Sequence, residues 1–244
     1  MDNIIQGQYR RISLNPLENE EYELNNDNIG EIEILNFSRD ISKNYKVTFE
    51  MSKEAMIGFG ISAIRLDEGL PEGYDIRVEP LGSSCANQPM GFFLTPDSPE
   101  LFFYGKEYGC LKDNLINIIN NGGNDKKYIS KRTVDFLVDL EWDNDYYEIY
   151  SIGFNNVARI RVFEDENEIT SRCDIVFRLS KSAFLGFGTS LIRIAHKYKE
   201  GDYYLSSPVE QNHKLGFYLT NKSIELEIKC KNNNTAFYYD RNVI

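Results

Sequence analysis

The sequence predicts an α+β protein made of two tandem copies of one unit, each a mainly antiparallel β-sheet with one central helix. Three observations support this fold class. The chain repeats itself at an offset of 128 residues, strand-like alternations flank one helix-like segment in each half, and the composition includes 16 Tyr and 15 Phe. Aromatic residues favour half-buried strands, so this composition indicates substantial β-structure.

The internal repeat is clearest around the predicted helix. FEMSKEAMIGFGISAIRL (49–66) aligns with FRLSKSAFLGFGTSLIRI (177–194), with ten identities in eighteen positions. The offset then falls to 125, where MGFFLTPDSPEL (90–101) aligns with LGFYLTNKSIEL (215–226). The period is too long for a solenoid repeat and fits a duplicated small domain. The expected repeats cover residues 1–125 and 126–244.

Strands are expected on both sides of the helix in each repeat. In the first repeat, EIEI (31–34), YKVTFEM (45–51) and YDIRVEP (74–80) alternate apolar and polar residues, as half-buried strands require. Farther along, MGFFLT and PELFFY are apolar runs separated by turn residues, a pattern interpreted as a hairpin. The predicted order of the unit is ββαβββ.

Each predicted helix begins after a serine and contains the motif GFG. Ser52 and Ser180 are expected N-caps, because serine favours that position. Gly58 and Gly60 lie in the middle of the first helix, where each glycine costs about 1 kcal/mol relative to Ala. We interpret them as sites where the helix backbone closely approaches the sheet or the other repeat. A phosphate-binding loop is excluded, since such glycines precede their helix.

Charge and hydropathy exclude several classes of protein. The chain has 27 Lys and Arg against 38 Asp and Glu, a net charge of −11. Nucleic-acid binding is not expected, because its affinity comes from basic residues that displace counterions. No segment approaches the roughly 18 apolar residues that span a bilayer, and no secretory signal is recognisable, so we expect a cytoplasmic protein without membrane contact. Residues 1–128 have a net charge of −9 and residues 129–244 of −2, so the repeats are expected to present different surfaces.

Residue patterns typical of catalytic or metal sites are missing from the sequence. The four cysteines form no C-x-x-C pair, and His196 and His213 have no zinc-ligand spacing. The acidic run that begins at Asp139 has Asn144 and Tyr150 where a calcium loop needs glycine and glutamate. The loop GSSCANQP has no nucleophile-elbow context. We therefore expect no enzyme activity, no metal site and no cofactor.

Two acidic segments contain interleaved aromatic residues, ENEEYE (18–23) and DLEWDNDYYE (139–148). Aromatic anchors supply much of the binding energy at protein interfaces, and surrounding carboxylates speed the encounter with a basic partner. These segments are the predicted binding surface. The predicted partner-binding residues are Glu18, Glu20, Glu21, Tyr22, Glu23, Trp142, Asp143 and Asp145.

Both repeats contain the pattern SK-x-A-x-x-GFG-x-S-x-IR followed by GF-x-LT-x-x-S-x-EL. Through it the chain resembles short acidic bacterial immunity-type proteins of toxin systems. The resemblance and the acidity together favour a cytoplasmic protein-binding module that captures a basic protein partner. Two alternatives stay open. One is a structural or oligomerisation module that self-associates through exposed strand edges, and the other is a small-molecule binder or enzyme with a site between the repeats.

Overall fold

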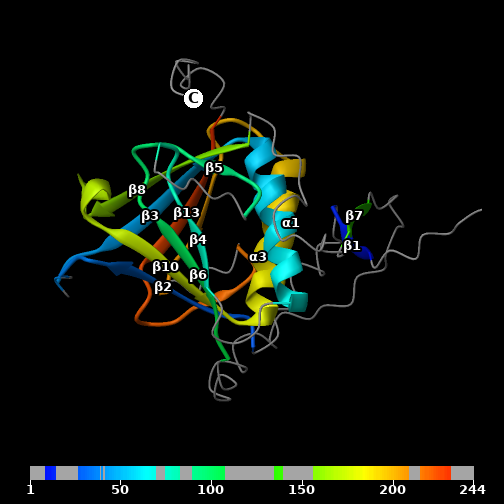
Figure 1. Cartoon of the computed structure of the whole chain (residues 1–244), viewed down its shortest axis with the longest axis horizontal. Coiled ribbons are helices and arrows are strands. Elements are labelled where there is room, and N and C mark those ends of the chain that lie inside the picture. Colours follow the sequence, from blue (N-terminus) through cyan, green and yellow to red (C-terminus); the bar gives the residue numbers. More distant parts are fainter. Residues whose placement is uncertain are drawn as a thin grey trace, which may run out of the picture.

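The computed structural model describes residues 9–14, 27–38, 40, 42–69, 75–82, 90–107, 135–139, 156–208 and 215–231. Two helices lie side by side, with two larger sheets on one side and a small ribbon on the other (Figure 1). The predicted α+β class is confirmed. The helical elements are α1 (Lys53–Gly69), η2 (Thr170–Arg172) and α3 (Lys181–His196). The strands are β1 (Tyr9–Ser13), β2 (Ile29–Leu35), β3 (Tyr45–Met51), β4 (Asp75–Val78), β5 (Phe93–Leu94), β6 (Leu101–Gly105), β7 (Asp135–Asp139), β8 (Val157–Glu164), β9 (Asn167–Glu168), β10 (Asp174–Leu179), β11 (Tyr203–Ser206), β12 (Tyr218–Leu219) and β13 (Glu225–Cys230).

Each of the two larger sheets contains strands from both halves of the chain. The order is β12-β2-β10-β6-β4 in the first sheet and β11-β13-β3-β8-β5 in the second sheet. Antiparallel pairs join β2 to β10 and β3 to β8, and the parallel pairs among the described strands also join different halves. Early and late colours therefore lie next to each other within each sheet in Figure 1. The two repeats share their sheets, and the boundary near residue 125 lies outside the described residues and stays a prediction.

The hairpin expected from MGFFLT and PELFFY is wrong. Strand β5 pairs with β8 in the second sheet, whereas β6 pairs with β10 and β4 in the first sheet. Between the two strands the N–H of Ser98 donates to the carbonyl of Thr95 at 3.0 Å, which turns the chain. Pro96 and Pro99 have no N–H with which to continue a ladder. The chain therefore leaves one sheet at this turn and enters the other.

The GFG glycines lie where two backbone segments nearly touch. A Cβ atom on Gly60 would lie 2.8 Å from the carbonyl oxygen of Gly188, and one on Gly188 would lie 2.5 Å from that of Gly60. Helices α1 and α3 therefore pack against each other at these two glycines, where a side chain would force them apart. The other two helix glycines approach loop carbonyls in the same way, in the pairs Gly58 with Gly91 and Gly186 with Gly216. The close-approach interpretation from the sequence is confirmed.

Phenylalanine side chains form the core between the sheets and the helices. Phe59 and Phe187, the aromatic residues of the two GFG motifs, lie edge to face with ring centroids 5.2 Å apart. Phe49 and Phe177 meet in the same way at 5.7 Å. All four are fully buried, and burying such a side chain stabilises the fold by roughly 1.5–3 kcal/mol. Both repeats therefore contribute to one core.

The antiparallel ribbon of β1 and β7 covers the helices on the side away from the larger sheets (Figure 1). Its buried residues Ile12 and Val138 belong to a second apolar cluster with Ile64 of α1 and Ile192 of α3. The ribbon thus forms a third layer. Neither helix, as far as the described ranges extend, is long and apolar enough to cross a membrane.

Several polar contacts occur twice, at positions related by the repeat offset. Ser52 and Ser180 each accept a hydrogen bond from the backbone N–H three residues later, both at 3.1 Å, which confirms the predicted N-caps. The side-chain amides of Asn28 and Asn156 donate to the carbonyls of the loop glycines at 3.2 and 3.1 Å. These recurring contacts support the tandem duplication, which itself remains a prediction of the sequence.

Candidate functional site

A groove of about 670 Å³ opens at one end of the first sheet, where β2 ends and β6 and β10 begin. This volume is within the range of small-ligand pockets, roughly 300–1,000 Å³. The first half of the chain contributes Asn36, the segment 80–82 and residues of the segment 96–100. The second half contributes residues of the segment 170–174. The groove therefore lies between the two repeats.

Hydrogen bonds hold the segments that line the groove. The hydroxyl of Ser98 accepts from a backbone N–H of β8 at 2.9 Å and shares a hydrogen bond with the hydroxyl of Thr95 at 2.8 Å. The hydroxyl of Thr170 donates to Glu168 at 2.8 Å and accepts from another backbone N–H of β8 at 3.0 Å. These hydroxyls fix the shape of the groove before any ligand arrives.

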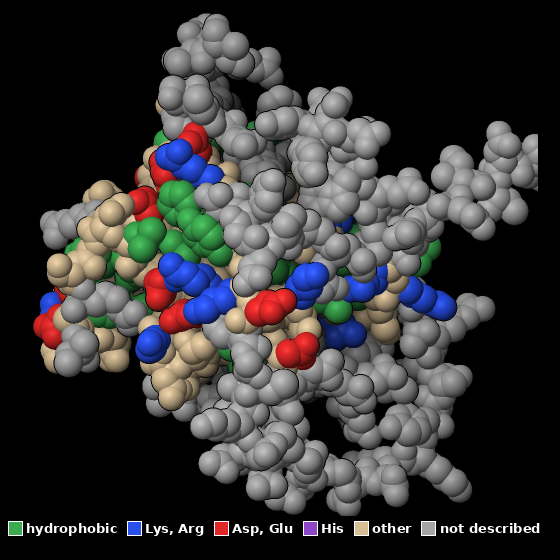
Figure 2. Space-filling model, turned by 60° about the horizontal axis from the view of Figure 1, so that its bottom comes forward, with side chains coloured by type: hydrophobic (Ala, Val, Ile, Leu, Met, Phe, Trp, Pro, Cys, Tyr) green, Lys and Arg blue, Asp and Glu red, His purple; other side chains and the backbone are tan. Residues whose placement is uncertain are grey.

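Among the described residues, the charged ones that line the groove are two carboxylates, Glu100 and Asp174. Glu100 is paired with Arg77, which donates to it from Nε at 3.0 Å and from Nη2 at 2.8 Å. Asp174 accepts a hydrogen bond from the amide of Asn36 at 2.6 Å, and the ion pairs formed within the described part of the chain do not include it. Among the described residues on the face shown in Figure 2, basic and acidic side chains are interspersed. Arg77 acts electrostatically on Asp174 but forms its ion pairs with Glu79 and Glu100. The half-buried Asp174 carboxylate offers a local attraction for a further cation.

The walls of the groove combine polar and apolar groups, and some of their backbone atoms offer no free donor. Three lining residues are prolines, which have no N–H group. The N–H groups of Leu81 and Ser98 are already bonded to carbonyl oxygens, both at 3.0 Å. Leu35 does not line the groove, but it lies opposite Asp174 across β2 and β10 and is 36% exposed. A Lys or Arg side chain would find apolar surface at Leu35 for its stem and the Asp174 carboxylate for its cation.

The equivalent corner of the second sheet is filled by a tyrosine. The repeat offset relates Cys173 in the groove to Tyr45, and both side chains are buried, at 5% and 4% exposure. The hydroxyl of Tyr45 donates to Glu164 at 2.8 Å, and Lys43 Nζ lies 2.9 Å from the same carboxylate. Hydrogen bonds from Lys43 and from Tyr45 hold the pKa of Glu164 below its ordinary value. The small Cys173 side chain thus leaves a space open. In the other corner, the Tyr45 ring and the Lys43–Glu164 ion pair occupy the equivalent space.

The predicted partner-binding residues of segments 18–23 and 139–148 lie outside the described residues, and that prediction stays open. The sequence prediction does not include Glu100, Cys173 or Asp174, because one carboxylate beside a strand and one cysteine form no recognisable pattern. A comparison of the two repeats position by position does indicate where they diverge at this corner. Cysteine and aspartate stand in the second repeat where Tyr45 and Lys46 stand in the first.

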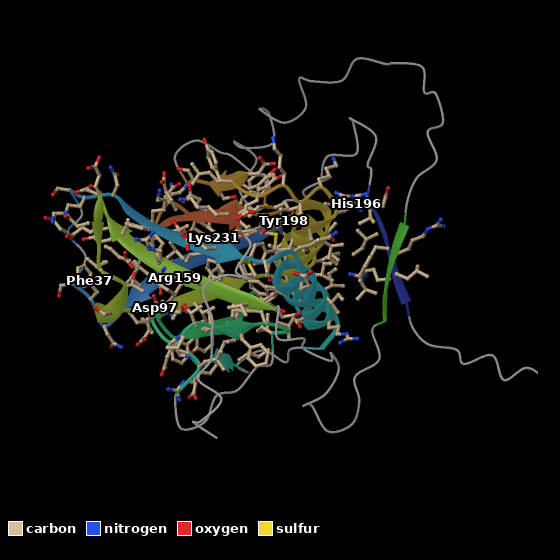
Figure 3. All side chains as sticks on the ribbon, turned by 90° about the horizontal axis from the view of Figure 1, so that it is seen from above. Phe37, Asp97, Arg159, His196, Tyr198 and Lys231 are labelled. Carbon is tan, nitrogen blue, oxygen red and sulfur yellow. The ribbon has the colours of Figure 1, made fainter. Side chains whose placement is uncertain are left out.

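The lining residues of the groove include no histidine. His196 is exposed at the end of α3, and Figure 3 places it far from Asp97, which lies in the β5–β6 connection beside the groove. The sulfur of Cys173 lies 3.6 Å from the carbonyl oxygen of Ile169 and 3.7 Å from that of Thr170, so it is packed against backbone. Within the described ranges, no three His, Cys, Asp or Glu residues are grouped so as to hold a metal ion.

No family model matches the chain, and neither a curated protein nor a solved structure is significantly similar to it. Inference about function therefore starts from the chemistry of the groove and of the surface around it. That chemistry is a carboxylate among mixed polar and apolar walls, in a space that both repeats line.

Proposed function

We propose that the protein is a binding module that captures a basic protein partner, and that the groove accepts a Lys or Arg side chain of this partner. The observation that carries the proposal is Asp174, a carboxylate in the groove with no ion pair among the described contacts and with exposed Leu35 beside it. A charged pair of this kind fixes the register of an interface and contributes to its specificity. The acidic segments 18–23 and 139–148 add negative charge to the chain.

The class of partner follows from charge and from the sequence resemblance. A net charge of −11 raises the rate at which a basic protein is encountered, and this effect weakens as salt rises. The immunity-type proteins that the chain resembles imply a basic toxin domain as the partner. The groove adds a specific contact to this general attraction, because it accepts one cationic side chain of the partner between the two repeats.

The experiment is affinity purification of the tagged chain from its native cells, at low and at high salt, with co-purifying proteins identified by mass spectrometry. The test variant is Asp174→Lys, which copies the residue of the first repeat at the equivalent position, Lys46. The control is Glu200→Lys, the same change of charge at an exposed residue after α3. A third variant changes Glu20, Glu21 and Glu23 to Lys and tests the first acidic segment separately.

We expect wild type and Glu200→Lys to retain one stoichiometric basic protein that high salt weakens. Asp174→Lys should raise the dissociation constant by at least about 30-fold, because losing one partner of a close charge pair costs about 2–5 kcal/mol. Circular dichroism of the purified variants checks that each is folded. A chain that purifies alone, or a basic partner held equally by all the variants, would contradict the proposal.

The volume of the groove favours a second candidate function, the binding of a small cationic molecule. About 670 Å³ is enough for a ligand of ordinary size. Native mass spectrometry of the protein purified from its cells would then show the added mass of a small molecule. This added mass should disappear in Asp174→Lys and persist in Glu200→Lys.

A further inference from the structure

The second sheet ends in a strand edge without charged residues. Strand β11 is the last strand in the order β11-β13-β3-β8-β5, and it pairs antiparallel with β13 alone among the described strands. Its sequence is Tyr-Tyr-Leu-Ser. Tyr203 is 64% exposed, the largest value among the large hydrophobic side chains of the described residues, and Leu205 is half-buried. Natural sheets usually protect such an edge with charges, proline or a covering segment.

The backbone of β11 directs hydrogen-bonding groups toward this open edge. The carbonyl of Asp202 accepts from the N–H of Cys230 at 2.8 Å, so residue 202 faces β13. Backbone groups alternate in direction along an antiparallel strand, so Tyr203 and Leu205 direct their N–H and C=O groups away from β13. Another extended strand can pair with these groups and replace water as their partner.

The equivalent edge of the first sheet has charged residues at the same positions. The repeat offset relates Tyr203 to Asp75 and Leu205 to Arg77 on β4. Arg77 forms ion pairs with Glu79 at 3.1 Å and with Glu100 at 2.7 Å. Charged side chains of this kind oppose pairing with another strand, so the described strands carry this protection on β4 and not on β11.

We propose that β11 pairs antiparallel with β11 of a second copy of this chain, forming a twofold dimer with a continuous sheet. In the register centred on Tyr204, Tyr203 of one copy lies opposite Leu205 of the other, and each pair exchanges both main-chain hydrogen bonds. Both side chains lie on the same face of the sheet, since they are two residues apart. The dimer thus has two aromatic–aliphatic cross-strand pairs, and no charge lies on either strand. The inference is independent of the groove.

The test is sedimentation equilibrium of the full chain over a wide range of concentration, at low and at high salt. We expect the mass to rise from one chain to two with concentration. High salt should strengthen the dimer, because screening weakens the repulsion between two chains of net charge −11. Salt has the opposite effect on capture of a basic partner, so the two proposals can fail separately.

The test variant combines Tyr203→Asp with Leu205→Arg, which copies the residues of β4 and is therefore compatible with this strand. It should stay monomeric at every concentration while its unfolding midpoint in urea stays near that of wild type. The matched control is Leu137→Asp on β7, which removes another exposed hydrophobic residue, 62% exposed, and should leave the dimer intact. A wild-type chain that is monomeric throughout, or a dimer that the double variant still forms, would overturn the proposal.

Discussion

The corner where β2 meets the start of β10 and the corner where β8 meets the start of β3 occupy equivalent places in the two repeats. The first is an open groove lined by Cys173 and Asp174. The second is filled by Tyr45, whose hydroxyl bonds Glu164, and Lys46 lies 3.5 Å from Glu227. The antiparallel pairing of the strands recurs at the two corners, whereas the side chains differ in size and in the sign of their charge.

This comparison separates the residue positions that maintain the fold from the positions at which the two repeats have diverged. Positions that recur in both repeats, such as the GFG glycines and the helix-capping serines, hold backbone segments in contact. Some of the positions that differ lie at a corner, as Tyr45 and Cys173 do, and others lie at a sheet edge, as Arg77 and Leu205 do. Changes at the shared positions should therefore affect both repeats equally, and changes at the divergent positions should affect the two corners unequally.

The largest loss of stability is expected at the shared glycines. Gly58→Ala and Gly186→Ala each place a Cβ against a loop carbonyl that cannot move without shifting the backbone. We expect each to lower the free energy of unfolding by about 3 kcal/mol, measured by urea denaturation. Thr189→Ala, at a half-buried position of α3, serves as the control and should cost less than about 1 kcal/mol. A large difference between the two glycine variants would show that the repeats do not share this packing.

The next largest effect is expected on opening the filled corner. Tyr45→Cys copies the residue of the groove, removes a buried ring and leaves Glu164 without the tyrosine hydroxyl. The free energy of unfolding should fall by about 2–3 kcal/mol, because a cavity replaces the ring. Urea denaturation at neutral pH measures this loss. A cost below about 1 kcal/mol would mean that Tyr45 does not support the corner.

The reverse change should be much less costly. Cys173→Tyr adds a ring where a groove of about 670 Å³ already provides space, so stability should change by no more than about 1 kcal/mol. The same variant should lose the basic partner in affinity purification, since the ring fills the site for the cationic side chain. Retention of the partner by a folded Cys173→Tyr variant would place its binding outside the groove.

The smallest effect is expected on the pH dependence of stability, which should differ between Glu227 in the second sheet and its counterpart Phe102 in the first sheet. Burial opposes ionisation of Glu227, but hydrogen bonds from Thr48 and Lys229 hold its pKa below the ordinary value of 4.5. The contribution of the ionised Glu227 is therefore full above about pH 4.5 and is lost as pH falls through the lowered pKa. Glu227→Gln should be less stable than wild type at pH 7, and the difference should shrink in urea titrations below pH 4.5. Phe102→Leu, at the equivalent position of the first sheet, should show no such narrowing.

The sequence predicts those parts of the fold that depend on local chemistry. The N-caps Ser52 and Ser180 and the strand order around each helix follow from short patterns, and the close approach at Gly60 follows from glycine in a helix. The exchange of strands between the sheets does not follow, because alternation along a strand does not identify its partner. For this reason the sequence predicts a hairpin at Pro96, where the chain in fact passes from one sheet to the other.

The groove is harder to predict than the fold because it results from a small side chain at one position. Cys173 matters because its counterpart, Tyr45, is large, and the contrast is visible only when the two repeats are aligned and their positions in space are known. Asp174 likewise becomes a candidate binding residue only because it lines this groove. Such a site has no motif, since its parts come from loops far apart in the sequence.

The most direct test of the central claim is an NMR titration of the ¹⁵N-labelled chain with N-acetyl-lysine methylamide, with the norleucine analogue as the neutral control. The lysine compound should shift the backbone amide signals of Gly82, Ser98 and Asp174 in wild type, with no such shifts in Cys173→Tyr or with the neutral analogue. Unchanged groove signals, or the same shifts in Cys173→Tyr, would contradict the claim that the open corner binds a cationic side chain.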